Sequence, residues 1–174
     1  MNIGVIGAGA WGTAFSLHLA RQNHQVLLWV YEQELYDVLC QTGENTFYLP
    51  GFQLPRQIRF TRGLDELSSF SENIVIATPS FALRKSIENS APLLSNKRIL
   101  SLTKGFEENT LFRMSEVIRG ILGNSCLIAV LSGPSFAREV AQGAFTSVVI
   151  SSEDNDLAQS LQQIIHNDNF RVYR

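Results

Sequence analysis

Residues 1–12 read MNIGVIGAGAWG, and this segment guides the interpretation of the whole chain. Residues 2–6 are mostly apolar and favour a short buried strand, and Gly7-Ala8-Gly9-Ala10-Trp11-Gly12 then matches the pattern G-x-G-x-x-G. Residues 13–21 contain several Ala and Leu residues and favour a helix. The order strand, glycine-rich turn, helix is the context in which this pattern indicates a dinucleotide-binding site rather than a turn with a purely structural role.

Each glycine of this pattern has its own predicted task. Gly7 permits the tight turn out of the strand, and Gly12 lets the helix pack close to the sheet. Gly9 has no Cβ, so a pyrophosphate is able to approach the backbone. The phosphates would then meet the free N–H groups and the positive dipole end of the helix.

The composition bounds the class of protein. The chain has 174 residues, which is enough for one domain with a substantial core and short for two. Its 14 Lys and Arg against 16 Asp and Glu give a net charge of −2, so we expect no nucleic-acid partner. No run approaches the roughly 20 apolar residues of a membrane span. Cys40 and Cys126 form no metal-binding motif, so we expect no metal site and two small buried side chains in a reduced, cytoplasmic protein.

The rest of the chain alternates between predicted strands and helices. Further strands are expected at 25–30, 58–61, 73–78, 98–102, 126–131, 145–151 and 170–173, and helices at 32–41, 81–94, 111–122, 136–141 and 154–166. This alternation predicts a doubly wound, mostly parallel α/β sheet in one domain, residues 1–174. The irregular segment 42–62 contains aromatic residues, which favour a packed functional loop over disorder.

Candidate functional groups follow the predicted strands. They are Gly7 to Gly12, Tyr31 and Glu32, Thr78-Pro79-Ser80, Thr103-Lys104-Gly105 and Ser132-Gly133-Pro134-Ser135. Because ligands of α/β sheets bind beyond the carboxyl ends of the strands, we expect these segments to lie at one edge. Lys104 is the strong cation among them. In a functional role it would polarise a carbonyl or neutralise a phosphate, and the alternative is a solvated loop lysine.

Two residues after the second strand face the predicted adenosine position. Glu32 lies about 20 positions after the glycine pattern, where an acidic residue takes the ribose 2′-hydroxyl and repels a 2′-phosphate. Alternatively, Glu32 only begins the helix at 32–41. Tyr31 either lays its ring along the adenine or is an ordinary half-buried aromatic.

Several segments together resemble a known family. They are GAGAWGTA (7–14), LWVYE (28–32), NTFYLPG (45–51), TKG (103–105) and SGPSFARE (132–139), which occur in the order and spacing of the NAD(P)-dependent sn-glycerol-3-phosphate dehydrogenases of bacterial type. The resemblance covers essentially the whole chain and implies a Rossmann-type domain. It also implies that dihydroxyacetone phosphate and sn-glycerol 3-phosphate are interconverted by hydride transfer at the nicotinamide, which feeds glycerophospholipid synthesis.

The resemblance and the motifs together give a set of expected site residues. The cofactor contacts are Gly7, Gly9, Ala10, Trp11, Gly12, Tyr31, Glu32, Pro79, Lys104 and Ala137. The substrate contacts are Lys104, Gly133 and Ser135, with Lys104 as the catalytic cation that stabilises the developing alkoxide. Either NAD or NADP fits the resemblance, and the aromatic–acidic pair Tyr31 and Glu32 tilts the expectation toward NAD.

The family also has a second, all-helical domain that this chain is expected to lack. In the family, that domain supplies the lysine that is the main proton donor and acceptor, and an Arg-Asn pair that binds the substrate phosphate. The sequence stops at Arg174, where the family's first domain ends, so we expect the chain alone to bind cofactor with little or no turnover. A non-catalytic dinucleotide-binding module and another hydroxyacid-type dehydrogenase remain as alternatives. The resemblance leaves a homodimer open for the full-length enzyme.

Overall fold

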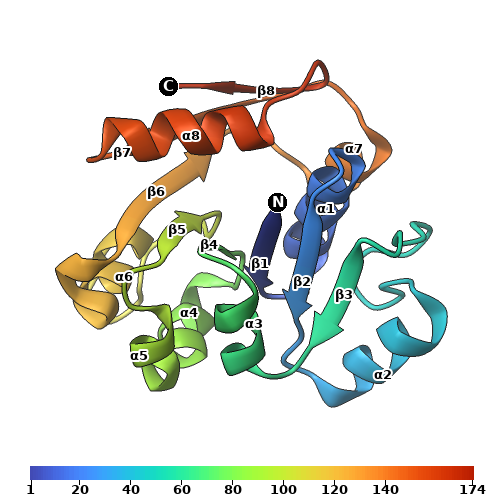
Figure 1. Cartoon of the computed structure of the whole chain (residues 1–174), viewed down its shortest axis with the longest axis horizontal. Coiled ribbons are helices and arrows are strands. Elements are labelled where there is room, and N and C mark those ends of the chain that lie inside the picture. The colour runs from blue at the N-terminus through green and yellow to red at the C-terminus, as the bar shows by residue number, and fades with distance from the viewer.

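The apolar segments of the chain pair into one eight-stranded sheet (Figure 1). All 174 residues are described by the computed structural model. The strands are β1 (Asn2–Ile6), β2 (Gln25–Trp29), β3 (Ile58–Thr61), β4 (Asn73–Ile76), β5 (Arg98–Ser101), β6 (Leu127–Ser132), β7 (Thr146–Ser152) and β8 (Phe170–Tyr173). They lie in the order β3-β2-β1-β4-β5-β6-β7-β8, and only the β6–β7 pair is antiparallel. The mostly parallel sheet predicted from the sequence is therefore confirmed.

Each connection between consecutive strands contains at least one helix. The helices are α1 (Ala10–Arg21), α2 (Gln33–Thr42), α3 (Leu64–Phe70), α4 (Ser80–Ile87), α5 (Ala91–Leu94), α6 (Met114–Leu122), α7 (Ala137–Gln142) and α8 (Asn155–Ile165), with the short 3₁₀ turns η1 (Glu88–Ser90) and η2 (Gly123–Ser125). None of the helices combines the length and the apolar composition needed to cross a membrane.

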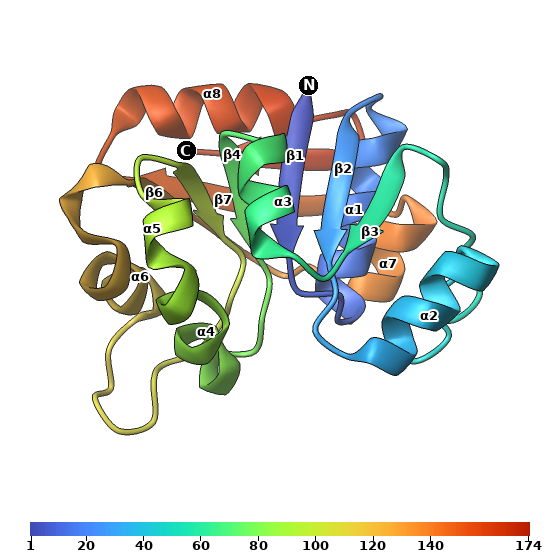
Figure 2. The ribbon, with the colours of Figure 1, turned by 60° about the horizontal axis from the view of Figure 1, so that its bottom comes forward.

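Each face of the sheet has its own hydrophobic core, because alternate side chains of a strand point to opposite faces. Val26 and Leu28 of β2 belong to a cluster of 31 buried residues that includes side chains of α1, α7 and α8. Leu27 and Trp29 belong to a second cluster of 16, which includes side chains of α3, α4, α5 and α6. Figure 2 shows α3 in front of the sheet and α1 behind it, so the helices cover both faces, as a doubly wound fold requires.

The carboxyl ends of the parallel strands β1 to β6 lie at one edge of the sheet. In Figure 2 the arrowheads of β1, β2 and β3 point down toward this edge. We call this edge the carboxyl rim and define it by the residues that follow the strands, which are 7–12, 31–33, 62–63, 77–80, 102–105 and 133–136. The strand order reverses at β1, which has β2 on one side and β4 on the other. Ligands of α/β sheets bind at such a switch point, so the fold brings the expected segments to the expected edge.

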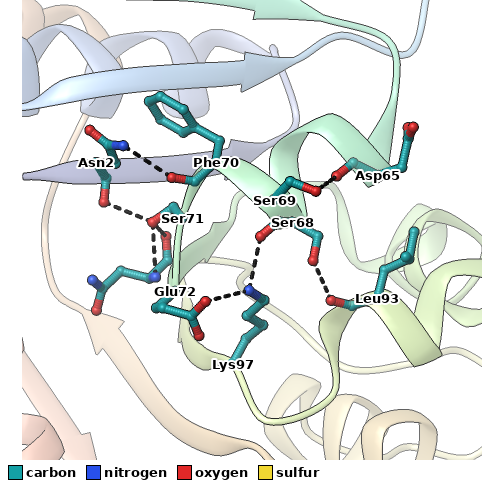
Figure 3. Close-up of polar contacts among 10 residues, drawn as sticks. Asn2, Asp65, Ser68, Ser69, Phe70, Ser71, Glu72, Leu93 and Lys97 are labelled. Atoms are coloured by element: carbon teal, nitrogen blue, oxygen red, sulfur yellow. Dashed lines mark hydrogen bonds and ion pairs between the residues drawn. The ribbon is translucent and has the colours of Figure 1, made fainter.

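Helix α3 has no counterpart among the predicted elements, because a seven-residue segment is too short to show a helical period. Figure 3 shows the polar contacts at its end. Ser71 Oγ donates to the carbonyl oxygen of Asn2 at 2.7 Å, and Lys97 Nζ donates to that of Ser68 at 2.9 Å. Asn2 begins β1, and Lys97 directly precedes β5, so this cluster holds α3 at the edge opposite the carboxyl rim.

Two expected helices differ from the observed ones. The helix expected at 81–94 is divided into α4, η1 and α5, and a proline lies in the first turn of α5. Proline has no backbone N–H to bond to the carbonyl four residues back, so the helix does not continue through. The helix expected at 111–122 begins only at Met114, because Leu111 has a left-handed backbone with φ +58°.

The cysteines are free, and only one of them is buried. Cys126 is buried, as expected, but the expectation was wrong for Cys40, which is exposed on α2. This helix buries only Leu35 and Leu39, which lie four residues apart on one face. Cys40 comes one position later and therefore lies off that face.

Candidate functional site

The glycine-rich turn between β1 and α1 has the geometry that its pattern predicts. Gly7 has φ +112°, and a Cβ built there would lie 3.0 Å from the carbonyl of Ala77. A Cβ on Gly12 would lie 1.9 Å from the carbonyl oxygen of Gly7, so only glycine fits this contact between helix and turn. Both glycines are therefore required by the fold itself.

Gly9 differs from the other two glycines because the fold does not need it. Its backbone is extended, with φ −70° and ψ −179°, and a Cβ built there would have no atom within 4 Å. Helix α1 begins at the next residue, Ala10, and the amide of Thr13 is the first to bond back, to the carbonyl oxygen of Gly9. The N–H groups of the first helical residues have no intrahelical partner and no side-chain cap. An open space thus adjoins free donors at the positive end of a helix, which suits a phosphate.

A buried asparagine ties the long loop after α2 to this turn. Asn45 is fully buried, and its Nδ2 donates to the carbonyl oxygen of Ala8 at 2.8 Å and to Oγ1 of Thr13 at 2.7 Å. Its Oδ1 accepts from the amide of Tyr48 at 3.0 Å. The loop therefore packs, as its aromatic content predicts, but no local pattern marks Asn45 as the residue that holds it. The 37 positions between Asn45 and Ala8 explain why sequence reasoning missed this contact.

Tyr31 and Glu32 extend the carboxyl rim beyond β2. Tyr31 is 72% exposed, and its ring centroid lies 5.9 Å from that of Trp29. Glu32 is the residue before α2, but its carboxylate does not cap the helix and instead accepts from the hydroxyl of Tyr48 at 3.0 Å. That hydrogen bond raises the pKa of Tyr48. The alternative that Glu32 only begins a helix thus explains the position of its backbone directly before α2. It does not explain where its side chain lies.

Lys104, Gly133 and Ser135 come together from two loops. Lys104 Nζ donates to the carbonyl oxygen of Gly133 at 3.1 Å and lies 3.5 Å from Oγ of Ser135. The lysine is exposed and forms no ion pair with a carboxylate. It is one of the residues that line an open groove of about 880 Å³ beside α6, β6 and β7. The three residues expected to contact substrate are therefore neighbours, with an ammonium group available to an oxygen ligand.

Pro79 and Ala137 also lie at the carboxyl rim. Pro79 is exposed and precedes α4, whereas Ala137 is partly buried and is the first residue of α7. Beside Pro79, the hydroxyl Oγ1 of Thr78 is buried without a hydrogen-bond partner.

An ion pair braces the loop that carries Lys104. Arg84 of α4 donates to both carboxylate oxygens of Glu107, at 2.7 and 3.0 Å, and Thr110 donates to the same carboxylate at 2.7 Å. The hydrogen bond from Arg84, followed by that from Thr110, lowers the pKa of Glu107 to about 2. Glu107 thus stays ionised at neutral pH and fixes residues 105–113 on α4, next to Lys104.

Comparison with known proteins now identifies the family. Residues 2–158 match the sequence model of the family described as NAD-dependent glycerol-3-phosphate dehydrogenase N-terminus. The chain belongs to this family. The match does not favour the two alternatives considered from the sequence, which were a non-catalytic module and another hydroxyacid-type dehydrogenase.

Individual relatives agree with this assignment. The chain is 41% identical over 177 residues to a glycerol-3-phosphate dehydrogenase [NAD(P)+] of Syntrophotalea carbinolica. The alignment covers 100% of this chain and 53% of the relative. It is 44% identical over 180 residues to an enzyme of the same name from Acidobacterium capsulatum, over 99% and 53% of the two chains. A crystal structure of glycerol-3-phosphate dehydrogenase from Coxiella burnetii superposes with a TM-score of 0.93 at 36% identity, covering 99% and 53%. The chain thus spans about half the length of the relatives it matches.

Proposed function

We propose that residues 1–174 form the cofactor-binding half of an oxidoreductase that interconverts dihydroxyacetone phosphate and sn-glycerol 3-phosphate with NAD(P)H. The observation that carries this proposal is the open space at Gly9, in front of the free N–H groups of α1, on the same rim as Lys104. The name of the relatives, glycerol-3-phosphate dehydrogenase [NAD(P)+], supplies the reaction and the cofactors.

The residues present fit a dinucleotide. Gly9, Ala10, Trp11 and Gly12 would hold its diphosphate, because their backbone combines open space with unpaired donors. Tyr31 and Glu32 would contact the adenosine half, and Pro79, Lys104 and Ala137 are the remaining proposed contacts. The bound nicotinamide supplies the hydride chemistry.

Lys104 is the proposed catalytic residue of this half. Its ammonium Nζ would stabilise the negative charge that develops on the ketone oxygen of the substrate, since a fixed cation at that oxygen is most effective in the transition state. The carbonyl of Gly133 and the hydroxyl of Ser135 hold Nζ in place, and they are the proposed substrate contacts. Residues 105–113, fixed by Arg84 and Glu107, keep the backbone after Lys104 in position.

The substrate-binding half is proposed to be the other part of the relatives' length. In this view, an all-helical domain supplies the general acid and base, and residues 1–174 alone bind cofactor with little turnover. Four large apolar side chains near the rim support a docking partner, since Phe81, Phe106, Leu111 and Phe136 are 61–75% exposed. The same proposal includes a homodimer of the full-length enzyme and a role in glycerophospholipid synthesis. It also includes a cytoplasmic, reducing location, which agrees with the two free cysteines.

Glu32 is the proposed basis of a preference for NAD over NADP. A carboxylate at the end of the second strand accepts from the ribose 2′-hydroxyl and repels a 2′-phosphate. Tyr48 holds one carboxylate oxygen of Glu32, and no hydrogen bond occupies the other.

A binding titration followed by a fusion tests the proposal. The chain is titrated with NADH while the fluorescence of Trp11 and Trp29 is recorded, and it is then fused to the C-terminal half of the Syntrophotalea carbinolica relative. We expect NADH to bind to the chain and the fusion to reduce dihydroxyacetone phosphate. A folded fusion that binds NADH without turnover would favour the non-catalytic module, and a folded chain that binds no NADH would overturn the proposal.

A further inference from the structure

The arginine that directly follows β3 lies beside the segment that follows β2. Arg62 is the first residue after β3, which pairs in parallel with β2. Its Nη2 donates to the carbonyl oxygen of Tyr31 at 3.2 Å, and its Nη1 donates to the side-chain oxygen of Gln33. The guanidinium therefore bonds to the residues on either side of Glu32, at the place proposed for the adenosine ribose.

The charge of Arg62 has no partner within the chain. Arg62 is exposed and takes part in none of the four ion pairs of the structure. Its two acceptors are a carbonyl oxygen and an amide oxygen, both neutral, so the guanidinium keeps a full positive charge and its remaining N–H donors for an anion.

The other cations are arranged differently. Arg59 lies within β3, three positions before Arg62, but its guanidinium stacks over the ring of Phe70 at 5.1 Å from the centroid. Lys104 follows β5, and β1 and β4 separate that strand from β2. The loop between α2 and β3 has one basic residue, Arg56, which precedes β3 and so lies toward the edge opposite the carboxyl rim. Arg62 is thus the cation that adjoins Tyr31 and Glu32.

NADP differs from NAD by one phosphate on the 2′-oxygen of the adenosine ribose. A planar guanidinium binds a phosphate through two parallel charge-assisted hydrogen bonds, and an arginine beside this ribose is how dinucleotide folds accommodate that phosphate. We infer that Arg62 binds the 2′-phosphate of NADP, so that Glu32 and Arg62 together let one site take either cofactor. This inference rests on the proposed function, and it goes further by naming the residue that admits the second cofactor.

The two charged residues act in opposite directions on the same group. Glu32 favours a free 2′-hydroxyl and Arg62 favours a phosphorylated one, because the sign of each charge differs. Their balance sets the ratio of the two dissociation constants. Arg62 reaches this position from β3, so its role does not depend on a basic residue directly after β2, where this sequence has Tyr31 and Glu32.

The test measures both dissociation constants in matched variants. Wild-type chain, Arg62→Met and Arg59→Met are titrated with NADH and with NADPH by tryptophan fluorescence. Both variants lose one positive charge, Arg59→Met within β3 and Arg62→Met directly after it, and both keep a long side chain. For Arg62→Met, we expect the Kd for NADPH to rise by about 10- to 100-fold, because two charge-assisted hydrogen bonds are lost but solvent screens them at an exposed guanidinium, and we expect the Kd for NADH to change less than about twofold. Arg59→Met should change neither, and Arg62→Lys should recover part of the NADPH affinity.

The outcomes separate this inference from the proposed function. An equal loss of NADH and NADPH affinity in Arg62→Met would show that Arg62 only supports the loop, and it would overturn the inference while leaving the dinucleotide site intact. An unchanged Kd for NADPH would overturn it as well. If the folded wild-type chain bound neither cofactor, the proposed function itself would fall. Competition by 2′,5′-ADP but not by 5′-AMP, lost in Arg62→Met alone, would confirm that the 2′-phosphate is the group bound.

Discussion

Replacing Gly9 by valine separates the function of the glycine-rich turn from its folding. The backbone of Gly9, at φ −70° and ψ −179°, lies in a region open to any residue, and a Cβ there would meet no atom within 4 Å. We therefore expect the free energy of unfolding of Gly9→Val to stay within about 0.5 kcal/mol of wild type, as for an ordinary surface substitution. The valine methyls instead occupy the space through which a diphosphate would approach α1.

The size of the effect on binding follows from the donors that would be lost. If the valine displaces the diphosphate from two backbone N–H groups, two charge-assisted hydrogen bonds of about 1.5–3 kcal/mol each are lost. Together they amount to about 3–6 kcal/mol, which raises the Kd for NADH by about two to four orders of magnitude. Isothermal titration calorimetry measures the Kd, and thermal unfolding by circular dichroism measures stability on the same samples.

Two other glycines serve as controls. Gly120 on α6 also has no atom within 4 Å of a built Cβ, so Gly120→Val should bind NADH as wild type does. A Cβ on Gly12 would lie 1.9 Å from the carbonyl oxygen of Gly7, so Gly12→Ala should lose stability as well as binding. A folded Gly9→Val that binds NADH within twofold of wild type would refute the placement of the diphosphate at this turn.

Three further predictions concern other parts of the structure. In the fused enzyme, Lys104→Ala should lower kcat by about 10²–10³-fold, whereas a near-normal rate would return Lys104 to a solvated loop lysine. Asn45→Ala loses two donated hydrogen bonds, so its free energy of unfolding should fall by about 1–3 kcal/mol and its NADH affinity should fall with it; unchanged values in urea unfolding and titration would contradict the role of Asn45. Burial lowers the pKa of His18 from 6.5 to about 4. As the pH falls, the imidazole of His18 is therefore protonated in the unfolded chain before it is protonated in the folded chain. The free energy of unfolding should therefore decrease by about 3 kcal/mol between pH 6.5 and pH 4 and level off below, and His18→Gln should flatten this part of the profile measured by urea unfolding.

Much of the fold and of the rim follows from local sequence patterns. The glycine pattern between a predicted strand and helix predicts the turn, and the alternation of strands and helices predicts the parallel pairing of β1 to β6 but not the antiparallel pairing of β6 with β7. Once the strands are parallel, Lys104 and Gly133 must lie at the same edge, because they follow neighbouring strands. Their 3.1 Å contact is therefore a consequence of topology that the sequence makes predictable.

The remaining features depend on contacts between distant residues. Asn45 bonds to Ala8, 37 positions away, and Arg62 bonds to Tyr31, 31 positions away. Arg62 has no period or motif to mark it, and the NTFYLPG segment that begins with Asn45 does not show which distant residue Asn45 contacts. Helix α3 is not predicted because its local pattern is too short. Its seven residues make fewer than two full turns, so no helical period of apolar residues can be recognised.

A crystal structure of this chain with NADH tests the central claim most directly. The account predicts electron density for the diphosphate against the N–H groups of Ala10, Trp11 and Gly12, with the adenosine toward Glu32 and the nicotinamide toward Lys104. Density for NADH elsewhere on the molecule, or a rim that stays empty at saturating NADH, would contradict it.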